Sequence, residues 1–471
     1  MDKAALIEFF NRIAPEWDRW KQKNWYYHRE IERLYSSLIP PGSRVLELGC
    51  ATGDLLNALR PSHGVGVDFS PEMIRIARQK YPQLTFEVTD AEDPLPSGPY
   101  EYLVISNLVG YLGDIWSTLR RLSGLVTPQT RIVMTYYNYL WEPLLKAATF
   151  LRLKTPMPPQ NWLPLPDLAN LLSVTNFEVI RQGRRLLVPV PIPLLAPFLN
   201  RFLAVLPGLK RLGVIEYLVA RPIFRNGLSQ EATCSVIIPC RNEEGNIEQL
   251  VERMPALGSH TELIFVDGNS TDGTRERIEA LMARDTGRKD ITLLSQGTVT
   301  GKGHAVRMGF EAAHGEILMI LDADMTVVPE DLEQFYRVIQ EGHGELVIGS
   351  RLVYPMERQA MRFLNLMANH VFSLIFTALL EQRITDTLCG TKVIRKRDYE
   401  KIVAGRSFFG DFDPYGDFDL IFGAARLNLK ITELPVRYRE RVYGVTKISR
   451  FRHGWLLLQM CGVAMRKLKF V

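Results

Sequence analysis

The apolar run "ILMIL" at residues 317–321 is the feature that most constrains the fold, because two acids follow it directly. A short, wholly apolar run predicts a strand buried on both faces, as in a parallel sheet covered by helices. Residues i and i+2 of a strand point to the same side, so Asp322 and Asp324 should leave the sheet together. Such a pair can share one hard cation, Mg²⁺ or Mn²⁺, with a bound diphosphate. A solvated pair of acids at a strand end is the alternative.

Five further motifs accompany this pair in chain order: "SVIIPCRNEEGNI", "LIFVDGNSTDGT", "GKGHAVRMGF", "VIGSR" and "RVYGVTK". Glycines and Lys302 ahead of an expected helix form a natural anion site. Arg351, which follows the strand pattern "ELVIG", can reach a phosphate through two donors. The alternative for Arg351 is a surface ion pair. The motifs together favour a site for a nucleotide-sugar.

This order of motifs resembles the family 2 glycosyltransferases of the GT-A fold, and within them the dolichol-phosphate mannosyltransferase group. The resemblance covers roughly the C-terminal half of the chain. It implies an inverting sugar transfer from a UDP- or GDP-sugar, with Asp322 and Asp324 as the metal ligands. The family usually has two adjacent acids where this chain has Asp267-Gly268. The residues that the resemblance implies at the donor are Pro239, Arg241, Glu243, Asp267, Lys302, Asp322, Ala323, Asp324 and Arg351.

Two further segments concern the acceptor. Asp417 and Asp419 stand where related enzymes keep a general base, which a hydroxyl acceptor would need and an ionised phosphate would not. The alternative is that both acids simply begin a helix. "RVYGVTK" resembles the Arg-x-x-Gly-x-Ser-Lys loop of polyprenyl-phosphate glycosyltransferases, and it places Arg441 and Lys447 beside two phosphates. We therefore expect a polyprenyl-phosphate acceptor, with a soluble or saccharide hydroxyl as the alternative.

A second set of motifs lies upstream. "RVLELGCATGDLL" predicts a strand, a turn and the start of a helix, with Gly49 and Gly53 allowing the backbone to approach a ligand. The next strand pattern, "GVGVD", ends at Asp68, where an acid commonly accepts hydrogen bonds from ribose hydroxyls. Ala51 and Asp54 replace two glycines of the dinucleotide fingerprint, so that fingerprint is not met.

The spacing instead resembles the class I S-adenosylmethionine-dependent methyltransferases. The resemblance implies that S-adenosylmethionine is the cofactor and that a small molecule, or a glycan- or lipid-linked intermediate, is methylated. Ala51 takes the place of the middle glycine. The alternative is a binding module without catalysis. The residues that the resemblance implies at the cofactor are Glu47, Gly49, Ala51, Gly53, Asp68, Asp90, Ala91 and Asn107.

The chain of 471 residues is too long for one core, so we expect two doubly wound α/β domains. The first, residues 1–225, would hold the methyltransferase fold with an apolar insertion at 186–213. The second, residues 232–471, would hold the glycosyltransferase fold and end in an amphipathic helix. Residues 1–36 are expected to be helical, and their aromatic side chains either pack on the sheet or form a lid over the methyl donor.

Net charge and cysteine content limit the expected partners and the expected cellular compartment. A formal net charge of +5 is small for this length and does not indicate a nucleic-acid partner. The five cysteines form no C-x-x-C pair, which predicts reduced thiols in the cytoplasm and neither a zinc site nor a disulfide framework. "MDKAALIEFF" does not resemble a signal peptide.

Two apolar segments concern a membrane. Residues 186–209 carry one charge but five prolines, which argue against a single straight helix. This segment is either a cap on the protein's own core or a surface for a membrane or lipid. The C-terminal stretch "HGWLLLQMCGVAMRKLKFV" is too short to cross a bilayer and suits a helix on the membrane surface. We expect peripheral attachment at the cytoplasmic face of a membrane, with a helix docked on its own domain as the alternative.

Overall fold

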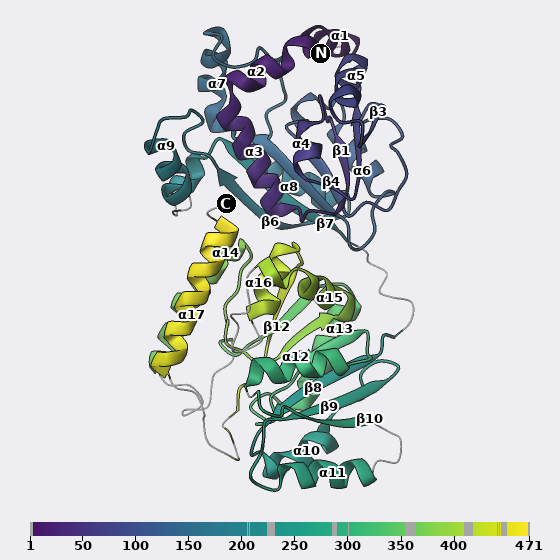
Figure 1. Ribbon diagram of the computed structural model, residues 1–471, viewed down its shortest axis with the longest axis vertical. Coiled ribbons are helices and arrows are strands. Elements are labelled where there is room, and N and C mark those ends of the chain that lie inside the picture. The colour runs from purple at the N-terminus through teal and green to yellow at the C-terminus, as the bar shows by residue number, and fades with distance from the viewer. Residues whose placement is uncertain are drawn as a thin grey trace. The chain divides into compact units, whose positions relative to one another are not determined.

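The computed structural model describes residues 3–204, 206, 208–223, 231–284, 290–299, 301–353, 363–408, 418–439, 441, 443 and 450–469. The chain divides into two compact units, the first reaching Phe224 and the second beginning at Arg225 (Figure 1). Each unit contains one seven-stranded sheet. Helices alternate with mostly parallel strands in both, so the expected α/β class with two doubly wound domains is confirmed.

The first unit begins with helices α1 (Lys3–Ile13), α2 (Trp17–Lys23) and α3 (Trp25–Leu38). Its sheet has the order β3-β2-β1-β4-β5-β7-β6, and β7 runs antiparallel to both of its neighbours. The strands are β1 (Arg44–Leu48), β2 (His63–Asp68), β3 (Thr85–Val88), β4 (Tyr102–Ser106), β5 (Arg131–Tyr137), β6 (Phe177–Arg185) and β7 (Ile215–Pro222). The remaining helices are α4 (Asp54–Ala58), α5 (Pro71–Lys80), α6 (Ile115–Leu122), α7 (Glu142–Phe150), α8 (Leu165–Val174) and α9 (Leu195–Phe198).

This strand order places the loops after β1, β2 and β4 at one edge of the sheet. The chain leaves β1 toward β2 on one side, whereas β4 lies on the other side of β1. A crevice forms outside the carboxyl ends of the strands where the order reverses in this way. The loops that follow these three strands therefore meet at one place, and they carry Gly49, Asp68 and Asn107.

The apolar insertion lies between β6 and β7, as expected, and it is not one straight helix. It consists of the four-residue α9, a π-helical stretch at Leu199–Leu203 and a 3-10 turn at Leu209–Leu212. Prolines interrupt regular hydrogen bonding along it. Of these three elements only Ala196 in α9 has a buried side chain, so the segment covers little of the core.

The second unit has the sheet order β10-β9-β8-β11-β13-β12-β14, with β13 antiparallel to β11 and β12. Its strands are β8 (Cys234–Cys240), β9 (Thr261–Asp267), β10 (Asp290–Ser295), β11 (Ile317–Ile320), β12 (Leu346–Ser350), β13 (Lys392–Arg395) and β14 (Ile431–Pro435). Its helices are α10 (Glu244–Arg253), α11 (Thr274–Arg284), α12 (Lys302–Ala312), α13 (Leu332–Gln340), α14 (Phe363–Leu380), α15 (Lys396–Ala404), α16 (Phe418–Arg426) and α17 (Arg450–Ala464).

Strand β11 ends one residue earlier than the sequence pattern predicts. The strand stops at Ile320, so Asp322 and Asp324 lie in the turn that follows it. The side chain of Asp324 accepts hydrogen bonds from the backbone and hydroxyl groups of Thr326, at 3.1 and 2.7 Å, and these bonds stabilise a turn in place of a longer strand. The alternation of side chains along a strand therefore does not orient these two carboxylates.

The C-terminal helix α17 packs on its own domain with one face. Met460, Cys461 and Ala464 are buried in the core cluster that also contains Phe372 and Phe376 of α14, and α17 lies beside α14 (Figure 1). Among the residues described, no helix is both long and apolar enough to cross a membrane.

Candidate active sites

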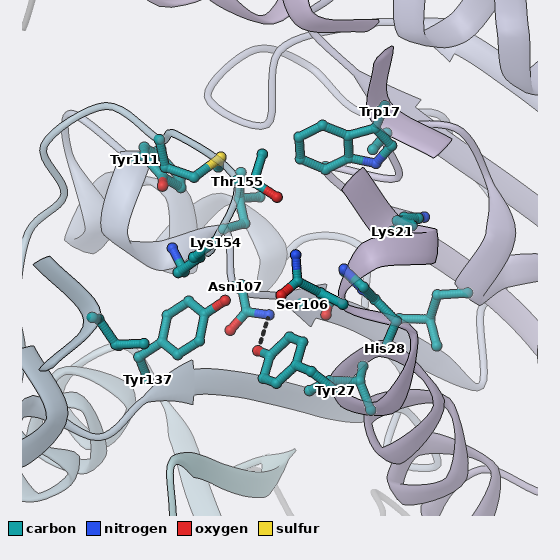
Figure 2. A pocket seen from close by; sticks show the side chains of 18 of the residues that line it. Trp17, Lys21, Tyr27, His28, Ser106, Asn107, Tyr111, Tyr137, Lys154 and Thr155 are labelled. Carbon is teal, nitrogen blue, oxygen red and sulfur yellow. Dashed lines mark hydrogen bonds between the residues drawn. The ribbon is translucent and has the colours of Figure 1, made fainter. Parts of the chain in front are cut away.

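A cavity of about 340 Å³ lies at the carboxyl edge of the first unit's sheet, within reach of α2 and α3 (Figure 2). Five of the eight residues predicted at the cofactor line it: Glu47, Gly49, Ala51, Asp68 and Asn107. They come from β1, the loop after it, and the ends of β2 and β4. The strand order thus brings together residues that are sixty positions apart in the chain.

The loop after β1 is held against β2 by its own backbone. The N–H groups of Gly49 and Cys50 both donate to the carbonyl of Val67, at 2.8 and 3.0 Å. Gly49 has a φ of 71°, in the left-handed region that favours glycine. Ala51 adopts a φ of 45° although it has a side chain, so the position of the missing middle glycine still has the backbone shape of a tight loop.

Asp68 is fixed by two backbone donors. Its carboxylate oxygens accept hydrogen bonds from the N–H of Ala51 and the N–H of Ser70, each at 2.9 Å. Burial raises the pKa of Asp68 to about 6, and the two hydrogen bonds oppose that rise. The side chain is therefore oriented before any ligand arrives, as a residue that recognises ribose hydroxyls needs to be.

Three buried polar atoms on the cavity wall have no hydrogen-bond partner in the described part of the chain. They are the indole N–H of Trp17, one carboxyl oxygen of Glu47 and the carboxamide oxygen of Asn107. An unmet buried polar group costs about 1–3 kcal/mol. Three of them around one space indicate that a ligand completes their hydrogen bonds.

Glu47 is the ionisable residue among these three, and its pKa is strongly shifted. Its side chain is buried, and burial raises the pKa of Glu47 to about 8, although the nearby ammonium of Lys21 acts in the opposite direction. The carboxyl group is therefore mainly protonated at neutral pH.

Aromatic side chains form much of the remaining wall. The amide of Asn107 donates to the phenol oxygen of Tyr27 at 3.2 Å, the dashed line in Figure 2. Tyr27 stacks on Tyr137 with ring centres 5.7 Å apart, and the ammonium of Lys154 lies 5.2 Å from the Tyr137 ring centre. The cavity thus combines apolar surface with a few polar groups, as sites for small organic ligands do.

The N-terminal aromatic segment contributes both to the core and to the cavity wall, whereas its role as a lid over a methyl donor stays a prediction. Tyr26 is buried in the core, whereas Trp17 and Tyr27 line the cavity. His28, to which the sequence gave no role, lines it too. Burial, and then the charge of Lys21, lower the pKa of His28 to about 4, so this imidazole is neutral at pH 7. The sequence signal that could have indicated this position is the run of aromatic residues directly before His28.

The other three predicted cofactor residues, Gly53, Asp90 and Ala91, are not on the cavity wall. Gly53 has a φ of 78° and begins α4, and a Cβ there would run into the ring of Phe86. The carboxylate of Asp90 forms an ion pair with Lys3 at 2.7 Å. Tight packing, and not contact with the cavity, accounts for a glycine at position 53.

In the second unit, a group of charged side chains comes from four motifs that are distant in the sequence. Arg441 donates to Asp324 at 2.5 Å, and its guanidinium lies 3.7 Å from a carboxylate oxygen of Glu243. Lys302, the first residue of α12, forms an ion pair with Asp322 at 2.5 Å. We call these five residues the charge cluster. It contains both predicted metal ligands, and each of them is neutralised by a cation of the same chain.

Asp322 is held ionised by its neighbours. Burial alone would raise its pKa, but the positive charges of Lys302, Lys392 and Arg351 together outweigh burial, and the net pKa of Asp322 lies below its usual range. Gly390 faces this ion pair, and a Cβ at position 390 would collide with both the carboxylate and the ammonium. The pair therefore occupies space that only a glycine leaves open.

The other predicted donor residues lie around the same sheet edge. Pro239 is in β8, Arg241 follows it, and Asp267 ends β9. Asp267 is buried and accepts a hydrogen bond from the N–H of Ser270 at 3.1 Å. Ala323 stands between Asp322 and Asp324 in the sequence, and its side chain is buried. Among the residues described, no group of three or more histidine, cysteine or acidic side chains is placed to hold a metal ion.

Arg351 has a partner that the sequence did not indicate. We expected either a phosphate contact or a surface ion pair, but its guanidinium binds the fully buried Asp386 through two contacts, at 2.7 and 2.8 Å. The ring of Tyr438 lies 5.0 Å from the same guanidinium. The donors of Arg351 are therefore engaged inside the protein.

The predicted acceptor residues are only partly described. Asp419, in α16, lies 3.1 Å from Arg307 and 3.2 Å from Arg406. Asp417, Thr446 and Lys447 lie outside the described residues. The carboxylate of Asp419 is thus engaged by two guanidinium groups of the same unit.

Comparison with known proteins identifies both units. Residues 19–182 match the family model described as a methyltransferase domain, and residues 235–403 match the model for glycosyl transferase family 2. The polyprenol monophosphomannose synthase of Mycolicibacterium smegmatis is 28% identical over 220 residues, which is 45% of this chain and 80% of that protein.

Two further proteins are similar to parts of the chain. The undecaprenyl-phosphate 4-deoxy-4-formamido-L-arabinose transferase of Pseudomonas aeruginosa is 28% identical over 227 residues, 46% of this chain and 61% of that protein. A solved S-adenosylmethionine-dependent methyltransferase of Thermotoga maritima, a possible histamine N-methyltransferase, aligns with a TM-score of 0.37 and 16% identity over 46% of this chain and 99% of its own. The chain thus carries two transferase domains, a methyltransferase domain followed by a glycosyltransferase domain of family 2.

Proposed function

We propose that the protein is a bifunctional transferase. Its second unit would transfer a sugar from a UDP- or GDP-sugar to a polyprenyl phosphate, with inversion and with help from Mg²⁺ or Mn²⁺. Its first unit would use S-adenosylmethionine to methylate a small molecule or a glycan- or lipid-linked intermediate.

The charge cluster is the observation that carries the glycosyltransferase proposal. Each of its two aspartates is matched by a cation: Asp322 by Lys302, and Asp324 by Arg441, which also lies near Glu243. A nucleotide-sugar and a divalent cation would bring the complementary charges to the same place. Lys302 and Arg441 would bind the diphosphate, and the carboxylates of Asp322 and Asp324 would then hold the cation.

The donor chemistry of the cluster fits such a cation, because carboxylate oxygens are the ligands that Mg²⁺ and Mn²⁺ prefer. When bound, the cation supplies charge stabilisation for the departing diphosphate. Lys302 and Arg441 would orient the diphosphate and share its negative charge during the displacement.

A phosphate acceptor fits the described residues better than a hydroxyl. Asp419 is paired with Arg307 and Arg406, so it is a poor candidate for removing a hydroxyl proton. Of the relatives named above, one is named as an undecaprenyl-phosphate sugar transferase and another as a polyprenol monophosphomannose synthase. An ionised phosphate needs no base. Lys447 would meet the lipid phosphate, as the resemblance of "RVYGVTK" implies.

The decisive experiment is a donor screen with the full chain, following release of free nucleoside diphosphate. UDP- and GDP-sugars would each be tested with Mg²⁺, Mn²⁺ or EDTA, and with a polyprenyl phosphate or a soluble sugar as acceptor. We expect release that needs both a metal and the polyprenyl phosphate. Full release in EDTA would remove the metal from the mechanism, and release that depends only on the soluble sugar would replace the proposed acceptor.

The cavity carries the methyltransferase proposal. Its wall contains three unpartnered polar atoms and the oriented carboxylate of Asp68. A ligand with both hydrogen-bond donors and acceptors would satisfy these groups. S-adenosylmethionine has ribose hydroxyls, an ammonium and a carboxylate. The matched Methyltransferase domain model supports this choice.

Calorimetry with S-adenosylmethionine and with NADH tests this half of the proposal. We expect binding of the first and none of the second. Binding of NADH alone would overturn our interpretation of the loop after β1. Binding of S-adenosylmethionine without methyl transfer to any glycan- or lipid-linked acceptor would favour the binding module.

A further inference from the structure

The first unit exposes an apolar patch formed by two segments, residues 139–153 and 190–212. Most of the exposed large apolar side chains described in this unit belong to these segments. The most exposed are Leu144, Phe150, Leu151, Leu153 and Leu194. Large contiguous apolar surfaces on a soluble domain usually mark an interaction site.

The two segments lie side by side. The indole N–H of Trp141 donates to the carbonyl of Leu212 at 2.7 Å, and the amide of Asn138 donates to the carbonyls of Arg211 and Gly213. Helix α7 contains no buried residue, although most of its side chains are apolar. Its apolar groups therefore contribute little to the folding of the unit, and they are free to contact something else.

The cavity of the first unit opens within this patch. Leu145 and Ala148 of α7, together with Pro189, form part of its wall. Leu153 and Val190 also line it, and they are 57% and 52% exposed. Because the same two side chains face both the cavity and the solvent, whatever covers the patch also covers the entrance to the cavity.

The charge of the two segments is one-sided. Residues 139–153 and 190–212 contain five basic residues and a single acid, Glu142. Trp141 lies at the junction of the segments, and Tyr139 precedes it in the same turn. Such side chains favour the interface between lipid and water. Apolar groups that protrude among cations match a bilayer with anionic head groups.

We propose that this patch docks on an anionic membrane and thereby places the entrance of the cavity at the lipid surface. The methyl acceptor would then be a molecule held in the bilayer by an apolar tail. The statement about the acceptor rests on the proposed methyltransferase function, whereas the docking does not depend on it.

Site-specific fluorescence of the full chain tests the docking. All five native cysteines are buried, so a cysteine placed on the surface can be labelled selectively. The probes are Phe150→Cys and Leu194→Cys, where the native side chains are 87% and 89% exposed. The matched control is Val88→Cys, since Val88 is exposed on β3, at the opposite edge of the sheet from β6.

Each labelled variant carries an environment-sensitive dye and is mixed with vesicles of phosphatidylcholine, with or without phosphatidylglycerol. We expect the emission of the dye at positions 150 and 194 to shift to the blue with anionic vesicles, and to be quenched by spin labels on the acyl chains. Position 88 should show neither change. High salt should reduce the shift, because the cations of the patch are then screened.

The absence of a shift at positions 150 and 194, or an equal shift at position 88, would overturn the docking. A shift without vesicles that grows with protein concentration would assign the patch to a second copy of this chain and would also overturn it. Calorimetry with S-adenosylmethionine on the same variants reports the proposed function separately. Loss of that binding with retained docking would remove the methyltransferase proposal alone.

Discussion

The two candidate sites differ in how their polar groups are satisfied. The cavity of the first unit leaves buried atoms of Trp17, Glu47 and Asn107 without partners. The charge cluster of the second unit pairs Asp322 and Asp324 with cations of its own chain. Under the proposed function, both arrangements would receive a ligand, but in opposite ways.

The difference follows from the charges of the expected ligands. An organic cofactor can complete individual hydrogen bonds in a preformed space, so unmet donors and acceptors remain until it binds. A divalent cation and a diphosphate bring several charges at once. A cluster of like charges without partners would be very costly to bury, so such a site contains both signs and exchanges partners on binding.

The largest expected effect concerns the charge cluster. Asp322→Asn or Asp324→Asn should lower the rate of sugar transfer by roughly a hundred- to a thousandfold, the usual cost of losing one electrostatic contact to a developing charge. S-adenosylmethionine binding should not change. Release of nucleoside diphosphate measures the rate, and Glu333→Gln, at an exposed ion pair with Arg337, is the control. Near-normal rates in both variants would mean that the cluster is only structural.

Removing the oriented acid of the cavity should have the next largest effect. Asp68→Ala should weaken S-adenosylmethionine binding by about 1.5–3 kcal/mol, the range for hydrogen bonds to a charged group. The exposed Asp93 serves as control through Asp93→Ala. Calorimetry gives both affinities. Equal affinities for the two variants would show that Asp68 only stabilises the loop after β1.

The pH dependence of stability should reveal the buried carboxyl of Glu47. Its pKa is about 8 in the folded protein and about 4.5 when unfolded. Between these values the folded state keeps a proton that the unfolded state loses, so the free energy of unfolding should fall as pH rises, by at most about 1.4 kcal/mol per pH unit. Glu47→Gln should be less sensitive to pH over this window in thermal melts. Identical slopes for the two proteins would mean that the carboxyl is already ionised.

The smallest effect is expected at the acceptor. Asp419→Asn should slow transfer to a polyprenyl phosphate by less than about tenfold, whereas loss of a general base costs roughly a hundred- to ten-thousandfold. Thermal melting shows whether the variant still folds, since two arginines lose their partner. A hundredfold loss in a folded variant would favour a hydroxyl acceptor. The second unit would then resemble the first in having a carboxyl group that gains or loses a proton.

The sequence predicted the fold and the position of Asp68 because both depend on local patterns. Apolar runs followed by glycines and acids mark the ends of parallel strands, and the strand order then brings those ends together. The end of β11 was predicted one residue too late, because Asp324 closes a turn with Thr326, a local bond that competes with the strand.

Partners between distant segments could not be predicted. The pairing of Arg351 with Asp386, and of Asp419 with Arg307, depends on tertiary geometry that no spacing encodes. The same holds for His28, which reaches the cavity only because α3 packs beside the sheet edge. The roles of Gly53 and Asp90 at a cofactor likewise stay predictions, since neither residue lines the cavity.

Gly390 gives the second unit a steric weakness that has nothing to do with charge. The ion pair of Lys302 and Asp322 fills the volume where any other residue would carry its Cβ. One added methyl group at this position, as in Gly390→Ala, would displace Asp322 and Lys302 together, although the sequence would keep every ionisable group. The shape of the charge cluster can therefore be changed without changing its composition, because the ion pair fits only when position 390 carries a hydrogen atom in place of a Cβ.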